Sequence, residues 1–367
     1  MNSRVIISTL LVALLAFGVN AHAQITKLTE ETQTLEALYQ QAVAEGGELV
    51  VYAGGDLSSA EAYTEQAFKA RFPKIKLRVV VDYSKFHDAR VDFQFATGKV
   101  VPDVIHFQTL QNFPRWKQEG KLLPYKPAGF SKVHDSFRDA EGAWVAYAVV
   151  AFSYMIDSRA LGSDAPQTPE SLVEPRWRGR IASSLPQDDD AVLYLFKLYT
   201  EAYGRDWLDS LAQQQLRFAR GSHTPNVAIQ TGTHPIGLAT VGSLTSPASS
   251  QSRFMVPDGH SFMAWAHPAA IVRGAKNLAA AKLYLNWQLS PERQQQAFNG
   301  WSVRTDVKPQ GGLAPIWLYP NSNVDGFSAF MADRALVERW RQTMTLVFGE
   351  PSGPPSPGWL GLFPGRN

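Results

Sequence analysis

Three consecutive aspartates, Asp188-Asp189-Asp190, are the most unusual local feature of the sequence. They stand directly before an apolar, helix-like run that begins at Ala191. At such a position carboxylates cap free amides and meet the positive end of the helix dipole. A second interpretation is that one carboxylate faces a cleft and pairs with a ligand ammonium group. Both roles can hold together, because one aspartate can cap the helix while another reaches outward.

Two glycine-serine turns offer a competing chemistry. Residues 54–59 read Gly-Gly-Asp-Leu-Ser-Ser, and residues 221–224 read Gly-Ser-His-Thr. Such turns expose backbone N–H groups and hydroxyls near helix starts, which suits a carboxylate or a phosphonate. The alternative is ordinary turn and cap chemistry, in which Ser58 or Ser59 caps the helix that follows.

Aromatic and histidine residues give weaker signals. Three aromatic residues could wall a binding site or belong to the core: Tyr83, Trp144 and Trp265. The histidines after the first 23 residues are scattered, with no pair at i, i+4 and no cysteine partner, so no metal cage and no cofactor are predicted. They are His87, His106, His134, His223, His234, His260 and His267.

Catalytic motifs do not stand out. The sequence has no Gly-x-Ser-x-Gly elbow, no His-Glu-x-x-His and no Walker-type phosphate loop, so we expect a protein that is not an enzyme. The alternative is an exported hydrolase, such as a glycosidase, whose two carboxylates come from distant parts of the chain and meet in one cleft.

The composition further restricts the class of protein. The formal net charge is only +2, from 35 basic and 33 acidic residues, and no basic run predicts a nucleic-acid partner. The chain has no cysteine, so core packing rather than disulfides must hold the fold. A lipid-modified cysteine is excluded for the same reason.

The N-terminus predicts export. Arg4 precedes the apolar stretch Val5 to Val19, and Ala21-His22-Ala23 has the small-x-small pattern of a cleavage site. We expect residues 1–23 to be a cleaved signal peptide and the mature protein to be free in the periplasm.

In the first part of the chain, apolar strands alternate with helices. Strands are expected at 49–52, 77–81 and 104–107, which favours a parallel sheet covered on both faces. Ligands lie beyond the carboxyl ends of such strands. Those ends are residues 53–58, 82–84 and 108–109.

The second part has fewer strand signals. Residues 144–156 form an apolar stretch longer than a usual strand, which suits a segment crossing between lobes. A helix is expected at 190–203, a strand at 236–239 and a helix at 275–289. The tail from Glu350 is rich in proline and glycine.

The order of several short segments resembles the bacterial extracellular solute-binding proteins that serve ABC importers, in the cluster of ferric-iron, polyamine, thiamine and phosphonate binders. No segment is specific alone, but their order and spacing are typical of this fold. They are residues 48–53, 71–76, 102–105, 119–125, 148–157, 168–172, 175–181, 281–295 and 300–304.

The resemblance implies an α/β fold of the type II periplasmic-binding class, with two α/β lobes joined by crossover strands and a ligand cleft between them. The chain would cross near Val149, return near Phe262 and cross again near Val303. Lobe 1 would then comprise residues 24–149 and 263–303, and lobe 2 residues 150–262 and 304–349. Residues 350–367 would form a tail.

The same resemblance bears on the ligand. Ferric binders of this kind use an adjacent tyrosine pair, but the corresponding stretch, residues 238–244, contains no tyrosine. Direct ferric coordination is therefore not expected. A polyamine-like cation, a small organic anion or phosphonate, and a metal chelate all stay open.

The family's site can be transferred onto this sequence by position. The expected ligand-binding residues are Gly55, Asp56, Ser58, Tyr83, Ser84, Gln108, Asp188, Asp189, Ser222, His223 and Ser243. The implied partners are a small-molecule ligand and the permease and ATPase complex of an ABC transporter. We expect the protein to be a monomer.

Overall fold

The computed structural model describes residues 28–247, 249–297 and 299–353. The predicted signal peptide at 1–23 and the tail beyond residue 353 lie outside the described residues. Among the helices that are described, none is long and apolar enough to cross a membrane.

Within the described residues, a single mixed sheet of ten strands runs through both lobes. Its main order is β2-β1-β3-β10-β5-β8-β6-β7, while β4 pairs with β10 and β9 pairs with β5. The strands span Glu48–Gly54 (β1), Lys76–Asp82 (β2), Val104–His106 (β3), Leu122–Leu123 (β4), Val145–Asp157 (β5), Ile181–Ser184 (β6), Arg217–Ala219 (β7), Ile236–Val241 (β8), Ser252–Met255 (β9) and Met263–Val272 (β10).

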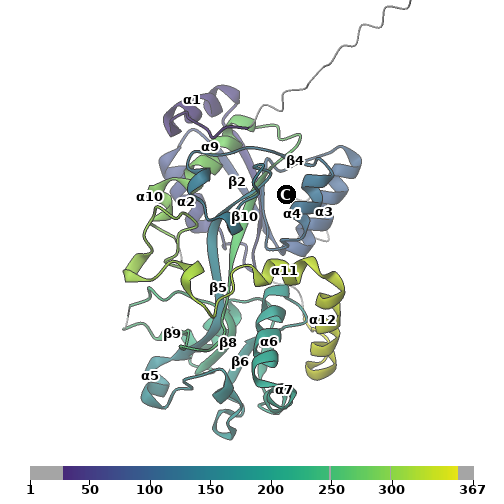
Figure 1. Cartoon of the computed structure of the whole chain (residues 1–367), viewed down its shortest axis with the longest axis vertical. Helices are drawn as coiled ribbons and strands as arrows, with labels where there is room; N and C mark the ends of the chain where they lie inside the picture. The colour runs from purple at the N-terminus through teal and green to yellow at the C-terminus, as the bar shows by residue number, and fades with distance from the viewer. Residues whose placement is uncertain (1–27, 248, 298, 354–367) are drawn as a thin grey trace, which may run out of the picture.

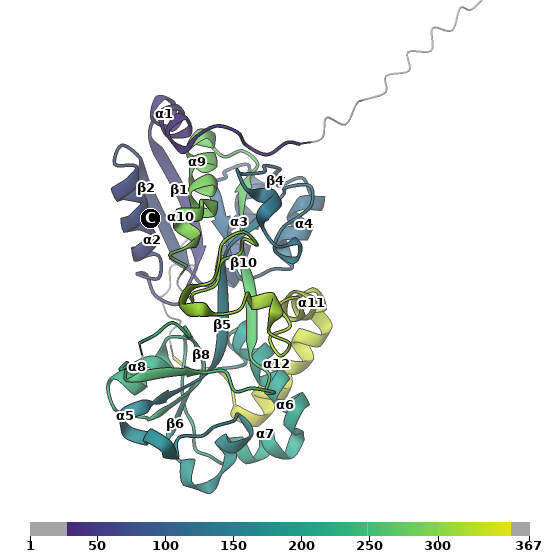
Figure 2. The same cartoon turned by 60° about the vertical axis from the view of Figure 1, so that its left-hand side comes forward.

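Helices cover both faces of this sheet and divide it into two lobes, seen above and below in Figures 1 and 2. Lobe 1 carries α1 (Leu35–Glu45), α2 (Ala62–Arg71), α3 (Ser84–Thr97), α4 (Asn112–Gln118), α9 (Leu278–Leu289) and α10 (Pro291–Gln294). Lobe 2 carries α5 (Ser158–Leu161), α6 (Asp190–Tyr203), α7 (Arg205–Ala212), α8 (Thr224–Gln230), α11 (Gly326–Ala332) and α12 (Arg334–Phe348).

The three strands expected from the first part of the sequence are confirmed and are parallel. β1 pairs with β2 from Glu48↔Lys76 to Gly54↔Asp82, and with β3 from Val51↔Val104 to Ala53↔His106. Alternate β1 residues face opposite layers: Leu49 and Val51 pack with the α1, α2 and α9 side, whereas Tyr52 packs with the α3 and α4 side. Their carboxyl ends therefore meet at one edge.

The long strands β5 and β10 join the lobes. They pair antiparallel along most of their length, from Met263↔Phe152 to Ala269↔Val145, and both run from one lobe into the other (Figure 2). The sheet is therefore mixed, and the expectation of parallel pairing holds for β1 to β3 and for β6 with β7 and β8.

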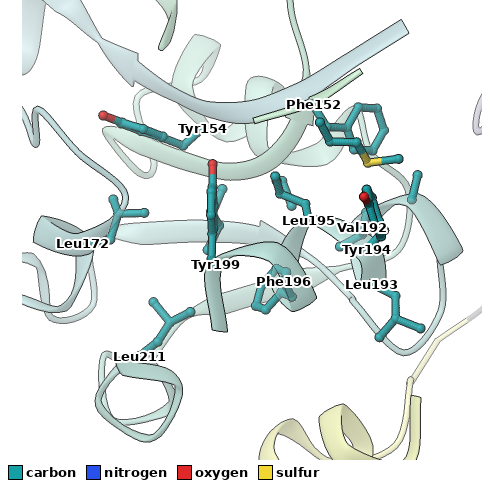
Figure 3. Close-up of a cluster of buried hydrophobic side chains, with 14 of the residues drawn as sticks. Phe152, Tyr154, Leu172, Val192, Leu193, Tyr194, Leu195, Phe196, Tyr199 and Leu211 are labelled. Carbon is teal, nitrogen blue, oxygen red and sulfur yellow. The ribbon is translucent and has the colours of Figure 1, made fainter. Parts of the chain in front are cut away.

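The core of lobe 2 is built largely on α6. Its buried residues include Val192, Leu195 and Tyr199, which pack with Phe152 and Tyr154 of β5 (Figure 3). The helix begins at Asp190 and ends at Tyr203, as the sequence predicted. Burial of this apolar face fixes the N-terminus of α6 relative to β5.

Two local predictions were wrong. α2 begins at Ala62 after the N-cap residue Glu61, and neither Ser58 nor Ser59 caps it with a side chain. The chain first makes a turn, in which the amide of Ala60 donates to Leu57 and that of Ala62 to Ser59. α9 begins at Leu278 rather than at residue 275.

Candidate functional site

A cavity of about 470 Å³ lies between the two lobes, beyond the carboxyl ends of β1, β2 and β3. Residues from both lobes and from the crossing strands line it, among them Gly54 of β1, Ser184 of β6 and Val150 of β5. We call this cavity the cleft.

The lobe 1 wall comes from three strand ends. Gly55 and Asp56 follow β1, Tyr83 and Ser84 follow β2, and Gln108 follows β3; all five line the cleft. Parallel pairing brings these ends together. The Ser84 hydroxyl accepts the Gln108 amide at 3.0 Å. It lies so near Gly54 that a Cβ there would approach its Oγ to 2.1 Å.

The lobe 2 wall comes from the start of α6 and the turn before α8. Asp188, Asp189, Ser222 and His223 line the cleft. Oδ1 of Asp189 accepts the amides of Ala191 and Val192 at 2.7 and 3.2 Å, so the predicted helix-capping role belongs to this aspartate.

Hydrogen bonds connect the two walls directly. The Ser222 amide donates to Oδ2 of Asp56 at 2.5 Å, and the Ser222 hydroxyl donates to the same oxygen. Lys85 donates to the carboxylate and the main-chain carbonyl of Asp188 at 2.9 and 2.6 Å. The Gln108 amide donates to Asp189 at 3.3 Å. The lobes are therefore closed on one another.

The three aspartates have different electrostatic environments. Burial raises the pKa of Asp188, but Arg220 and Lys85 outweigh it and hold that pKa below its usual value. Arg220 contacts both carboxylate oxygens of Asp188, at 2.7 and 2.6 Å. Asp190 forms an ion pair with Arg341 at 2.5 Å. Burial, followed by the charge of Asp56, raises the pKa of Asp189 to about 7.

Asp56 and Asp189 thus form an acidic pair drawn from opposite walls. Burial raises the pKa of Asp56 even though Ser222 donates two hydrogen bonds to it. Two nearby carboxylates that lose solvation favour protonation or a bound donor. Either group suits an ammonium, hydroxyl or amide donor on a ligand.

Nine of the eleven residues expected at the site line the cleft, and two lie outside it. Ser58 is exposed in the turn before α2. Ser243 lies beyond β8, where its hydroxyl contacts that of Thr245 at 2.7 Å. Of the aromatic candidates, Tyr83 and Trp265 line the cleft, whereas Trp144 packs against Phe113 in lobe 1.

The floor and one flank of the cleft consist of polar residues that sequence reasoning did not select. They are Glu61, Thr64, Tyr147, His267, Gln288, Arg293, Gln294 and Asn299. The sequence held one signal for this flank. His267 is a polar residue in the otherwise apolar strand β10, and it lies two positions from Trp265, so the two side chains face the same side.

A buried hydrogen-bond network supports this flank. His106 of β3 contacts the hydroxyls of Tyr147 and Tyr284 at 3.1 and 3.2 Å, and the Tyr147 hydroxyl donates to Glu61 at 3.4 Å. Burial holds the pKa of His106 well below its usual value and raises that of Glu61. At neutral pH the network therefore orients Glu61 through uncharged partners. Across residues 28–353, apart from 248 and 298, no three His, Asp or Glu side chains are grouped to hold a metal ion.

A sequence model of the family described as "Bacterial extracellular solute-binding protein" matches residues 99–308. A relative from Haemophilus influenzae, an uncharacterized protein, is 23% identical over 250 residues, which cover 62% of this chain and 72% of that protein.

Solved structures show the same fold at low identity. AfuA, a periplasmic binding protein from Actinobacillus pleuropneumoniae with fructose-6-phosphate bound, has a TM-score of 0.65 at 18% identity, covering 83% of this chain and 99% of its own. Iron-bound HitA from Pseudomonas aeruginosa has a TM-score of 0.62 at 15% identity, covering 81% and 99%. The substrate-binding protein of an ABC transporter from Agrobacterium tumefaciens has a TM-score of 0.65 at 14% identity, covering 82% and 94%.

Proposed function

The chain belongs to the bacterial extracellular solute-binding protein family, and we propose that it captures one small polar solute in the cleft between its lobes and delivers it to an ABC importer. The protein acts by binding alone, without catalysis. Lobe 1 comprises residues 24–149 and 263–303, and lobe 2 comprises residues 150–262 and 304–349.

One observation carries this proposal: polar contacts from both lobes meet around a cavity of about 470 Å³. Asp56, Lys85 and Gln108 of lobe 1 contact Ser222, Asp188 and Asp189 of lobe 2. A solute in this cavity would touch both walls and so favour the closed form over the open one. The closed form can then report occupancy to a membrane partner.

The site proposed for the solute keeps the nine expected residues that line the cleft and adds its polar floor. Carboxylate, amide and guanidinium groups line the cleft. These groups favour a small polar solute that is bound through hydrogen bonds and through a charged group of its own. Similarity to iron-bound HitA and to AfuA, with its sugar phosphate, is compatible with a polar solute.

Export and assembly complete the proposal. The leader at 1–23 would direct the chain to the periplasm, where it stays free of any lipid anchor and works as a monomer beside a permease and ATPase complex. The hydrolase alternative finds no support in the family, whose members are named for solute binding.

A thermal-shift screen of the exported protein tests the function. The panel contains polyamines, thiamine, amino-phosphonates, sugars, sugar acids, sugar phosphates and ferric chelates. A solute at 100 times its dissociation constant stabilises the protein by about 2.7 kcal/mol, which raises the midpoint by about 4 °C. Small-angle X-ray scattering should then show a smaller radius of gyration with that solute bound. A protein that responds to no class, and whose radius never changes, is not a solute-binding clamp.

A further inference from the structure

The floor of the cleft presents two buried polar atoms that have no partner within the described residues: Nε1 of Trp265 and Oδ1 of Asn299. Trp265 is 2% exposed and Asn299 is 1% exposed. Trp265 pairs with Val150 in the sheet, and the Asn299 amide nitrogen donates to the Val149 carbonyl at 2.8 Å. Both side chains line the cleft beside two adjacent residues of β5, Val150 for Trp265 and Val149 for Asn299.

The bond to Val149 fixes the orientation of the Asn299 amide. A flipped amide would place two carbonyl oxygens against each other, so Oδ1 is the atom left to accept a hydrogen bond. The Trp265 indole can only donate. A buried polar atom without a partner destabilises a fold, and a molecule bound in the cleft would satisfy both atoms. A hydroxyl group both donates and accepts, and so suits such a floor.

Arg293 adds a positive charge at the flank. Its guanidinium lies between the rings of Tyr63 and Trp287, at 5.1 and 4.9 Å from their centroids. Nη2 donates to Thr64 at 3.1 Å and Nε to Gln288 at 3.4 Å. The third nitrogen, Nη1, is buried and unpaired, and no carboxylate of the described residues forms an ion pair with Arg293. A guanidinium held in this way is ready to bind an anion.

The acidic groups near Arg293 form no ion pair with it in the described residues. Glu61 interacts with Arg293 electrostatically, but burial raises the pKa of Glu61 and the Tyr147 hydroxyl donates to it. Asp188 and Asp190 are already paired with Arg220 and Arg341. His267, also on the floor, is uncharged at neutral pH because burial lowers its pKa to about 4, and its Nε2 has no partner either.

We propose that the solute is a small hydroxylated organic anion, whose carboxylate or phosphate group binds Nη1 of Arg293 and whose hydroxyls bind Trp265 and Asn299. This inference rests on the proposed function, because it names the class of solute that the same cleft holds. Asp56 and Asp189 on the opposite side accept hydrogen bonds from further hydroxyls of that solute.

Isothermal titration calorimetry on the full exported protein tests the class of solute. The probes are sugar acids and sugar phosphates of three to six carbons, with gluconate and glucose 6-phosphate as the first pair. The comparison compounds separate the two features: glucose has hydroxyls without an anion, acetate and inorganic phosphate are anions without carbon-bound hydroxyls, and spermidine is a cation. We expect a hydroxylated anion to bind at least about tenfold more tightly than every comparison compound, since it alone satisfies both subsites. Whether a sugar acid or a sugar phosphate binds identifies the anionic group.

Two variants link that binding to the named residues. Arg293→Gln should weaken binding at least about tenfold, since hydrogen bonds to charged groups are among the strongest. Arg176→Gln is the matched control, because Arg176 also stacks on a tryptophan, Trp177, at 4.5 Å but lies outside the cleft. Trp265→Phe removes Nε1 together with the pyrrole part of the buried indole, so it should also lower the melting temperature of the solute-free protein. At a temperature where this variant is fully folded, it should weaken binding of the hydroxylated anion about fivefold. Unchanged affinity in the folded variant would show that Nε1 makes no contact with the solute.

The outcomes separate this inference from the proposed function. Binding of spermidine or a neutral sugar, with no response to any hydroxylated anion, overturns the inference and leaves the proposed function standing. Binding of a hydroxylated anion that Arg293→Gln leaves unchanged also overturns it. If no compound of any class binds, both fail.

Discussion

Ser222 donates both its main-chain amide and its hydroxyl to a single carboxylate oxygen of Asp56, with the amide nitrogen 2.5 Å from that oxygen. The two residues are 166 positions apart in the sequence and belong to different lobes. Asp56 follows β1, and Ser222 lies in the turn before α8. Both of these hydrogen bonds between the lobes therefore depend on the one carboxylate of Asp56.

Removing that carboxylate should open the clamp. In Asp56→Ala both hydrogen bonds from Ser222 are lost, and bonds to a charged acceptor are worth about 1.5–3 kcal/mol each. Because only the closed form makes them, the open form should become more populated while each lobe stays folded. Small-angle X-ray scattering should show a larger radius of gyration, and solute affinity should fall at least about tenfold. Asp258→Ala, at an exposed position, is the control. An unchanged radius and affinity would refute the role of Asp56 in closure.

Gly221 should resist substitution for two separate reasons. Its φ of +98° is unfavourable for other residues, and a Cβ would lie 2.7 Å from the His223 ring and 3.4 Å from Cβ of Asp56. Gly232 has φ +69° but nothing within 4 Å of such a Cβ. Both Gly221→Ala and Gly232→Ala should cost about 1–2 kcal/mol of backbone strain, measured by thermal unfolding. Only Gly221→Ala should also weaken solute binding, and equal affinities in the two variants would contradict this.

Asp189 should make the stability of the folded protein sensitive to pH. Its pKa is raised to about 7 from 3.8, by burial and then by Asp56. A raised carboxyl pKa means that the folded chain holds a proton which the unfolded chain has lost. The contribution to stability is therefore fully present below about pH 4 and is lost as the pH rises through 7. The other charged groups facing Asp189 are Asp56 and Asp190.

Asp189→Asn isolates that contribution, because asparagine still caps α6 but does not titrate. Melting temperatures from pH 4.5 to 8 should decline more steeply in the wild type than in this variant. Asp88, whose pKa is also raised to about 7, is present in both proteins and cancels in the comparison. Parallel curves for the two proteins would show that Asp189 keeps an ordinary pKa.

A buried ion pair holds the strand end that carries Tyr83 and Ser84. Nη2 of Arg90 lies 2.8 Å from Oδ2 of Asp82, and the two side chains are 1% and 0% exposed. Arg90→Met should leave Asp82 buried without its partner and cost about 3–5 kcal/mol, measured by chemical denaturation. Lys69→Met breaks an exposed pair with Glu65 and should cost less than about 0.5 kcal/mol. Similar losses in both variants would mean that the Asp82–Arg90 pair contributes little.

Much of one wall of the cleft could be predicted from the sequence. Apolar runs and glycine turns identified β1, β2 and β3, and parallel pairing then placed Asp56, Ser84 and Gln108 at one edge. The capping role of Asp189 followed from its place before an apolar helix. These features depend on neighbours within a few residues, where dihedral preferences and hydrophobic periodicity act.

The floor of the cleft was decided by the tertiary structure alone. Arg293 and Asn299 have no local pattern that distinguishes them from core or surface residues. Trp265 was one of three aromatic candidates that could equally belong to the core, and Ser58 has a local pattern but lies on the surface. Each of Trp265, Arg293 and Asn299 keeps one buried polar atom without a partner. This becomes apparent only when β5, β10 and the segment after α10 are packed together. A hydrogen bond between Asn299 and Val149 joins residues 150 positions apart. Sequence spacing determines which groups are near one another along the chain. Which polar atoms stay unpaired, and so could bind a solute, is decided only when distant segments have packed together and satisfied the other polar atoms.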